Sequence, residues 1–569
     1  MRIVSRMVTA LSKVYNLGCC LFGNEQKSDS ISSVSVNGDS CVLARGANNF
    51  IPNSISAINE VISAENTFKE KLADLWGISE DLQALQSTEY VLDWDMSIAM
   101  PPKSKDFRAW QLRALDKFKY EKLLSSKVSS MIEELSKDKN QHNLTEIEKA
   151  LLREIQGKYD WVKKVPLVLM EELIDVTTKG YESWILANEK GDFNIFVPEL
   201  KKIISIKRQI AEHVGYKDSP YDVFLDEYEP GLTVEKLQKI FSELKAKLIP
   251  ILKKIDEKQV ECNRSFLPFK MSPQYQLELT RRMLEDTGYD FSRSRIDLSE
   301  YPGSQGIASN DIRVIVNTKT NIFYLIACAL HESGHGRYDM GLPSELAKTP
   351  LYDAPSLSMH ESQSRMYETL IGHNMPFWKY YFPKLKEKFP EQFASVNLDD
   401  FYRAINYVEP PNVRSDDDDE LVYNLQMMIL CEVEQALIEG KIEVKDVPEL
   451  CSKLNKDYLD IKNDGVLGTL IHDHWITGTL GYFPTYIIGT LYAAQIYAAA
   501  KKANPDLEKQ IEKGDFSKLD LWLKENIYKY GKVKSAEEVL RLATGEDLNI
   551  DYFINYIKDK YGKLYNVEL

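Results

Sequence analysis

From about residue 56 onward, apolar residues recur three or four positions apart, with lysine and glutamate between them. This period matches one face of an α-helix, so the pattern predicts a mainly α protein. Pairs such as Pro101-Pro102, Pro230-Gly231 and Pro410-Pro411 are typical of the turns between helices. The predicted helices include residues 65–92, 104–137, 144–160, 199–215, 233–260, 271–287, 377–389, 420–440 and 484–502.

One segment departs from the helical period. Residues 311–317 are rich in β-branched side chains and read as a strand. A continuous apolar run, residues 322–330, follows directly and reads as the start of a helix that ends near Gly341 and Pro343. We therefore expect a small sheet beside this helix. There is no internal repeat of the kind that an α-solenoid would show.

The first 55 residues have a different composition, rich in Ser, Asn, Gly and Val. We interpret residues 24–50 as a disordered linker. Residues 1–24 contain basic residues and no acid, which is compatible with a weak organelle-targeting peptide, although an untargeted extension is the favoured interpretation. The predicted organisation is an N-terminal extension over residues 1–55 and a helical domain over residues 56–569.

The net charge and the composition argue against some classes of partner. With 71 basic and 86 acidic residues, the net charge is −15, which disfavours binding to nucleic acid or to an anionic membrane surface. No stretch is apolar over the roughly 18 residues that a membrane span needs. The seven cysteines are an odd number and form no CxxC pair, which is typical of a reduced compartment. We expect a cytoplasmic protein.

The strongest chemical signal is the segment His331-Glu332-Ser333-Gly334-His335 within the predicted helix. Side chains four residues apart share a helix face, so His331 and His335 can bind one cation. Glu332 lies one step around the helix, within reach of a water at that cation. Two imidazoles, an open coordination position and a carboxylate base are what zinc-assisted hydrolysis requires. A small sheet whose edge strand pairs with an extended peptide is a recurring companion of such a helix.

A catalytic zinc ion usually takes a third protein ligand. Six of the eight histidines lie between residues 331 and 474, so the chemistry is concentrated in this region. Downstream, Glu361 lies on a predicted helix that runs from His360 to His373 and is the first candidate. Glu345 and Glu368 compete with it on spacing alone, and the residues themselves do not rank the three.

Several further motifs occur in order along the chain. They are Trp94-Asp95 with Met100-Pro101-Pro102, Leu225 to Gly231, Asp311-Ile312-Arg313, His331 to His335, His360 to Arg365, Val408-Glu409-Pro410, Tyr423-Asn424-Leu425, His474-Trp475 and Gly481 to Pro484. With these motifs the sequence resembles the carboxypeptidase Taq family of metallocarboxypeptidases, from about residue 65 to the C-terminus.

The resemblance implies a fold, a site and a reaction. It implies a large, mainly α, neurolysin-like body with a deep groove, usually a homodimer, that removes the C-terminal residue of peptides with broad tolerance. Within that family, Glu361 is the third metal ligand and Glu332 is the general base. Arg313 and Arg414 lie in segments that match family motifs, and their guanidinium groups are the candidates for binding the terminal carboxylate of the substrate. His474 and Tyr482 are candidates for orienting the substrate or stabilising the oxyanion.

The chain departs from the family pattern on the substrate side. Ile315 stands where the family has a threonine, and Gln426 where a histidine is frequent. Ile471-His472 replaces a Gln-Asp pair, and the acidic run after Arg414 is one residue longer. These changes bear on subsite preference, and they weaken the assignment of Arg414 relative to Arg313. The metal-ligand positions are all retained.

The resulting hypothesis is a zinc-dependent carboxypeptidase acting on peptides with a free C-terminus, with Co²⁺ or Mn²⁺ as alternative metals. An oligopeptidase or endopeptidase on the same scaffold is the first alternative, because its zinc chemistry would be identical. A non-catalytic helical protein that retains a metal is the second alternative.

Overall fold

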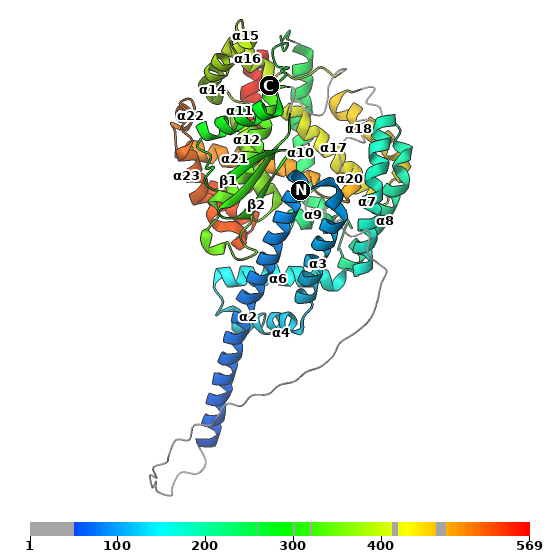
Figure 1. Cartoon of the computed structure of the whole chain (residues 1–569), viewed down its shortest axis with the longest axis vertical. Helices are drawn as coiled ribbons and strands as arrows, with labels where there is room; N and C mark the ends of the chain where they lie inside the picture. Colours follow the sequence, from blue (N-terminus) through cyan, green and yellow to red (C-terminus); the bar gives the residue numbers. More distant parts are fainter. Residues whose placement is uncertain (1–50, 259, 300–301, 319–320, 412–418, 462–473) are drawn as a thin grey trace.

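The computed structural model describes residues 51–258, 260–299, 302–318, 321–411, 419–461 and 474–569. Within these ranges, side chains are described from residue 63 onward, except at residue 102. The predicted extension over residues 1–55 lies almost entirely outside this range and stays a prediction. The helices that precede the sheet in sequence include α2, which projects furthest from the body in Figure 1. They are α2 (Ile51–Ile98), α3 (Lys105–Leu123), α4 (Ser126–Leu135), α5 (Asp138–Gln141), α6 (Glu146–Lys164), α7 (Leu167–Lys190), α8 (Val197–Val214), α9 (Asp222–Tyr228), α10 (Val234–Lys258) and α11 (Pro273–Asp286).

The remaining helices follow the sheet in sequence and include the most deeply buried ones. They are α12 (Ile322–Gly341), α13 (Leu357–Arg365), α14 (Met375–Lys388), α15 (Pro390–Phe393), α16 (Leu398–Ile405), α17 (Glu420–Ile438), α18 (Val447–Leu459), α20 (His474–Thr477), α21 (Phe483–Ala503), α22 (Leu507–Ile511), α23 (Ser517–Asn526), α24 (Ala536–Thr544) and α25 (Asp551–Tyr565). The mainly α prediction is confirmed.

Helix boundaries follow local capping. The helix predicted from residue 144 begins at Glu146, after a capping box in which Thr145 and Glu148 bond each other's backbone N–H. The single helix predicted over residues 104–137 is wrong. It is two helices, because the chain leaves α3 after Leu123 and the Ser125 side chain accepts a hydrogen bond from the backbone N–H of Val128, which starts α4.

The predicted strand is confirmed as β3 (Asp311–Val316), the central strand of a three-stranded sheet. β1 (Ser294–Leu298) pairs with it in parallel and β2 (Gly303–Ala308) in antiparallel orientation. Among the described residues, each outer strand pairs with β3 alone in this sheet. The sheet packs against α12, as the sequence predicts, and Figure 1 shows the two side by side.

The core is centred on α21, which packs along both α13 and α17. Every α21 residue from Phe483 to Tyr497 is buried, so this part of the helix is enclosed by protein on all sides. Among the described residues, α17 is the one helix long and apolar enough to cross a membrane, and 83% of its apolar window is buried inside the protein. Burial in a protein core accounts for such a composition.

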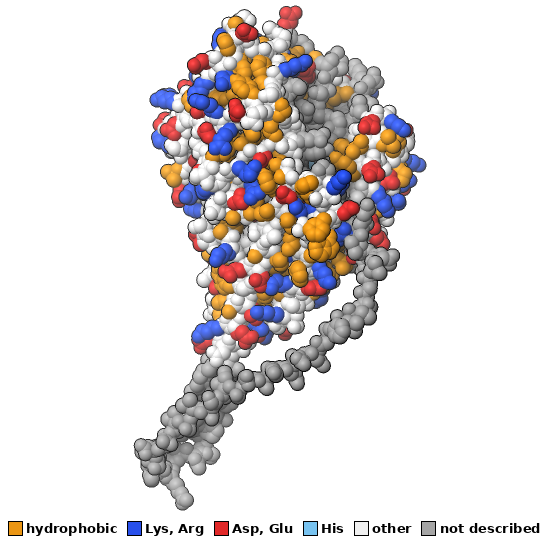
Figure 2. Space-filling model, in the orientation of Figure 1, with side chains coloured by type: hydrophobic (Ala, Val, Ile, Leu, Met, Phe, Trp, Pro, Cys, Tyr) orange, Lys and Arg blue, Asp and Glu red, His pale blue; other side chains and the backbone are white. Residues whose placement is uncertain are grey.

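The surface carries charged side chains of both signs as well as exposed hydrophobic ones. Acidic and basic side chains are interspersed over the face in Figure 2, and hydrophobic side chains gather near α3. Phe107, Trp110 and Phe118 on α3 are exposed.

Candidate active site

Helix α12 presents the two histidines of the HExxH motif. The helix starts at Asn321, whose side chain accepts a hydrogen bond from the backbone N–H of Phe323. Its first three turns are buried in the core, which fixes the rotation of the helix about its axis. His331 and His335 then emerge on the same face, with ring centroids 5.0 Å apart.

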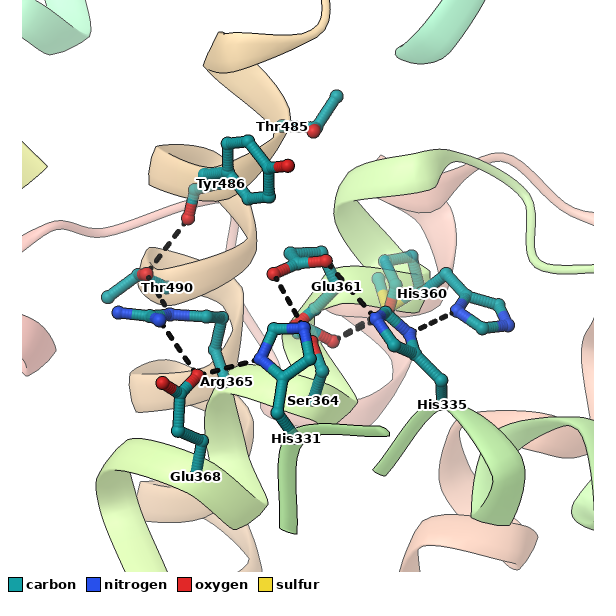
Figure 3. A network of polar contacts seen from close by, with 12 residues as sticks. His331, His335, His360, Glu361, Ser364, Arg365, Glu368, Thr485, Tyr486 and Thr490 are labelled. Carbon is teal, nitrogen blue, oxygen red and sulfur yellow. Dashed lines mark hydrogen bonds and ion pairs between the residues drawn. The ribbon is translucent and has the colours of Figure 1, made fainter. Parts of the chain in front are cut away.

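Glu361 on α13 completes a cluster of three side chains that could hold a metal ion (Figure 3). Its Oε2 lies 3.3 Å from His335 Nε2, and its Oε1 lies 3.7 Å from His331 Nε2. One ligand atom from each of the three residues lies within 4.8 Å of the others. The structure brings neither competitor into this cluster: Glu345 is exposed, and Glu368 bonds the opposite nitrogen of His331.

The cluster fits a divalent metal ion by its chemistry. Two imidazole nitrogens and one carboxylate are a ligand set used by catalytic zinc, which leaves a fourth position for water or substrate. Glu361 is buried, and its Oε1 accepts no hydrogen bond from any described residue. A buried carboxylate oxygen without a donor is costly, and a cation between the three side chains would satisfy it.

The charges around the cluster also favour a cation. Burial opposes protonation of His331, but the Glu361 and Glu368 carboxylates raise its pKa to about 9. Burial alone would raise the pKa of Glu361, yet the His331 and His335 imidazoles lower it to about 2. Burial lowers the pKa of His335 to about 4. The carboxylates thus stay ionised and attract positive charge to this point.

Two glycines allow the ligand helices to approach each other. A Cβ on Gly334 of α12 would lie 2.6 Å from the Cα of Ser364 on α13. A Cβ on Gly489 of α21 would lie 2.9 Å from the Cβ of Glu361. Both glycines pack directly against α13. Because neither has a side chain, α13 can lie close enough to place Glu361 beside the two histidines.

Replacement of Gly334 by alanine therefore destabilises the site. We expect the free energy of unfolding to fall by about 1–3 kcal/mol, since the clash involves backbone that cannot rotate away. Metal affinity should fall as well, because α13 moves with Glu361. Thermal unfolding and metal titration measure the two effects.

A matched glycine tests the interpretation. Gly157 lies inside α6, and its Cβ would meet nothing within 4 Å. Gly157→Ala should leave metal affinity unchanged and raise stability by up to about 1 kcal/mol, because alanine is the better helix former. Equal behaviour of the two variants would contradict the packing argument.

Outer contacts hold the first histidine. His331 Nδ1 donates to Glu368 Oε2 at 2.7 Å, and Arg365 Nη1 donates to the same oxygen at 2.8 Å. Glu368 lies in a π-helical turn (Met366–Ile371), so the helix predicted from His360 to His373 is α-helical only to Arg365. The sequence predicts Glu368 only as a possible third ligand, and its role as the partner of His331 appears only in the structure.

Glu332 lies beside the ligands without joining them. It is 5% exposed, and its negative charge contributes to the pKa shifts of both His331 and Tyr482. Its carboxylate is therefore close to the metal cluster and to the aromatic side chains opposite.

His474 and Tyr482 are brought together near the cluster. Both are buried, and their ring centroids lie 5.3 Å apart. Tyr486 joins them, with its hydroxyl 3.4 Å from His474 Nε2. Burial raises the pKa of Tyr482 well above its ordinary value, and the Glu361 and Glu332 charges raise it further. Tyr482 therefore lies near both Glu361 and the predicted base Glu332.

A buried glutamate that sequence reasoning missed holds this segment. Glu434 on α17 accepts hydrogen bonds from the Tyr221 hydroxyl at 2.8 Å, from Trp475 Nε1 at 3.0 Å and from the Gly481 backbone at 2.9 Å. Burial raises the pKa of Glu434 to about 7. Its only sequence signal was an acidic residue within an apolar helix, which does not name its partners.

The two arginines predicted to bind the substrate carboxylate, Arg313 and Arg414, differ in what the structure shows of them. Arg313 on β3 forms a two-point contact with Asp311 (2.9 and 2.8 Å) and lies 4.3 Å from the ring centroid of Trp94. The structure thus packs Arg313 on the sheet against α2, and among the described residues its side-chain hydrogen bonds go to Asp311 and not to the three clustered residues. Arg414 lies outside the described residues, as do the departures Ile471 and His472. Ile315 and Gln426 are both buried.

The fold and the site together define a metallopeptidase with a helical HExxH centre. The sequence profile of the Carboxypeptidase Taq (M32) metallopeptidase family matches residues 74–561. Carboxypeptidase 1 of Bacillus subtilis is 33% identical over 477 residues, which are 84% of this chain and 95% of that protein. Thermostable carboxypeptidase 1 of Pyrococcus furiosus is 31% identical over 512 residues, 88% of this chain and 100% of that protein.

The fold is also similar to that of solved structures from this family. The crystal structure of the M32 carboxypeptidase from Deinococcus radiodurans R1 superposes with a TM-score of 0.82 at 30% identity, covering 88% of this chain and 100% of that chain. The chain belongs to the carboxypeptidase Taq (M32) family and is a metallocarboxypeptidase. The family predicted from the sequence motifs is confirmed.

Proposed function

We propose that the protein is a zinc-dependent carboxypeptidase that releases single residues from the free C-terminus of peptides, with broad side-chain tolerance. The observation that carries this proposal is the convergence of His331, His335 and Glu361, with the buried Glu332 beside them. Co²⁺ or Mn²⁺ could take the place of zinc, because imidazole and carboxylate ligands accept all three ions.

The roles follow from chemistry and position. His331, His335 and Glu361 would hold the zinc ion, which would supply Lewis-acid polarisation of the scissile carbonyl and a water of lowered pKa. Glu332 accepts a proton from the attacking water and returns it to the leaving amine. His474 and Tyr482 face the carbonyl oxygen and stabilise the charge that develops there. Ionised Glu361 and Glu368 keep the imidazoles in place.

Recognition of the substrate's carboxylate is assigned to Arg313, with Arg414 as the second candidate. A guanidinium group binds a carboxylate through two parallel N–H donors. The bonds of Arg313 to Asp311 use Nε and Nη2, so we place the substrate on the Nη1 side. Asp311 and Trp94 then act as a rigid support that reduces the ordering needed on binding.

A pair of substrates tests this assignment. A peptide with a free C-terminus should be cleaved, whereas its C-terminal amide should react at least about tenfold to a hundredfold more slowly, since a charge-assisted hydrogen bond is lost. Mass spectrometry of timed digests should show loss of single terminal residues. Equal rates on acid and amide would contradict the exopeptidase assignment, and internal fragments would favour the oligopeptidase alternative.

Arg313→Gln should reduce kcat/KM for the free acid by about tenfold to a hundredfold and leave the amide nearly unaffected, for the same reason. Arg295 offers a matched control: it lies 4.6 Å from the same Trp94 ring and pairs with Asp297, but its side chain is 54% exposed against 16% for Arg313. Arg295→Gln should leave the acid-to-amide ratio unchanged. A similar change in both variants would indicate a general effect of sheet charge.

The assembly and the cellular location are proposals that rest on the sequence alone. We propose a homodimer, as the family resemblance implies, which light scattering of the purified chain can test. A cytoplasmic location is proposed from the cysteine pattern, and cell fractionation or a fluorescent fusion of the full chain can test it.

A further inference from the structure

The second histidine ligand is supported differently from the first. The outer nitrogen of His331 meets a carboxylate directly, but His335 Nδ1 lies 2.6 Å from Nδ1 of another imidazole, His360. The two rings have centroids 4.6 Å apart and planes inclined by 26° (Figure 3). This short contact between nitrogens requires one proton between them, so one ring donates and the other accepts.

The proton order follows from the ligand geometry. His335 Nε2 faces Glu361 in the metal cluster, so its Nδ1 carries the proton and donates to His360. His360 Nδ1 is then the acceptor, and His360 Nε2 carries the other proton. That nitrogen lies 3.0 Å from Oδ1 of Asp339, a buried carboxylate on α12. The chain of donors runs from His335 through His360 to Asp339.

The sheet packs against Asp339, the last residue of this hydrogen-bond chain. A Cβ on Gly306 of β2 would lie 2.6 Å from Asp339 Oδ2, so the strand backbone lies directly against the carboxylate. β2 is an outer strand with a register shift between Gly306 and Ala308. Asp339 is therefore confined between α12 and the sheet, with no room for a side chain at Gly306.

We propose that His360 and Asp339 are positioning residues of the metal centre: they fix the tautomer and the ring plane of His335, and Gly306 keeps Asp339 in place. This inference rests on the proposed role of His335 as a metal ligand. Without His360, the proton on His335 Nδ1 would lack its acceptor and the ring could turn away from the cluster. Neither residue touches the substrate in this role.

The test measures metal affinity as well as activity. The metal-free protein is titrated with Zn²⁺ against a chromophoric chelator, and kcat and KM are then measured at saturating Zn²⁺. His360→Phe should weaken zinc binding by about tenfold to a hundredfold, the usual effect of losing an outer partner of a metal ligand. His360→Gln should restore most of the affinity, because an amide can accept from one neighbour and donate to the other.

Tyr338→Phe is the matched control. The Tyr338 ring packs 5.2 Å from His360, and its buried hydroxyl bonds to no described residue. Removing that hydroxyl changes the same neighbourhood without interrupting the donor chain, so zinc affinity should be unchanged. Zinc affinity in His360→Phe equal to that of the wild type would overturn the proposal, as would an equal loss in Tyr338→Phe.

Two further variants cover the case in which His360→Phe does not fold. Asp339→Asn keeps the shape of the chain and removes its charge, and Gly306→Ala pushes on Asp339 from the sheet without altering α12. Both should weaken zinc binding, and unchanged affinity in both would overturn the proposal. A wild-type protein that binds no stoichiometric metal would instead refute the proposed function, so the two failures are distinguishable.

Discussion

Glu332→Gln should lower kcat by about 10²- to 10⁴-fold, the usual contribution of a positioned general acid–base group. The substitution keeps the size of the side chain and removes its ability to take a proton. Glu332 is not one of the three clustered ligands, so zinc affinity and KM should change little. Peptide cleavage measured at saturating Zn²⁺, together with metal analysis of the same sample, gives both quantities.

The control for this substitution is Glu345→Gln. Glu345 undergoes the same chemical change, but it is exposed on the short turn that follows α12. It should retain wild-type activity. Full activity in Glu332→Gln would refute its role as the base, and an equal loss in both variants would show that the assay reports something other than this carboxylate.

Removal of the metal should have the second large effect. A strong chelator should abolish cleavage, and Zn²⁺ or Co²⁺ should restore it. Metal that binds only the folded chain also stabilises it, by about 2.7 kcal/mol at a hundredfold excess over Kd, so the unfolding temperature should rise on zinc addition. Calorimetry of the apo and zinc-loaded full chain measures this shift.

Glu361→Gln and Glu368→Gln compare the two carboxylates that compete on spacing. Glu361→Gln should abolish both the zinc-dependent stabilisation and the activity, because it removes a ligand. Glu368→Gln should weaken zinc binding by only about tenfold to a hundredfold, because it removes an outer partner of His331. The reverse order would refute the assignment of Glu361 as the third ligand. Activity that survives complete removal of metal would refute the metal-dependent mechanism.

Local patterns in the sequence account for much of the fold. The apolar period of the long helices and the β-branched run of β3 both act within a few residues, so they can be read from the chain. The break at Ser125 was missed because the apolar period continues across it. The α12 pair, His331 and His335, could be read for the same reason: one helix turn fixes their relation.

The sequence by itself determined the helical class, the two histidines and, through its ordered motifs, the family. Spacing left Glu361, Glu345 and Glu368 open, the family resemblance pointed to Glu361, and the tertiary structure brings Glu361 to the two histidines. Only the tertiary structure placed His360 and Asp339 behind His335 and joined Glu434 to Trp475 and Gly481. The physical reason is distance along the chain. A metal ligand set and its supporting hydrogen bonds depend on how α12, α13, α17, α21 and β2 pack, and spacing in sequence does not encode close approaches such as those at Gly334, Gly489 and Gly306.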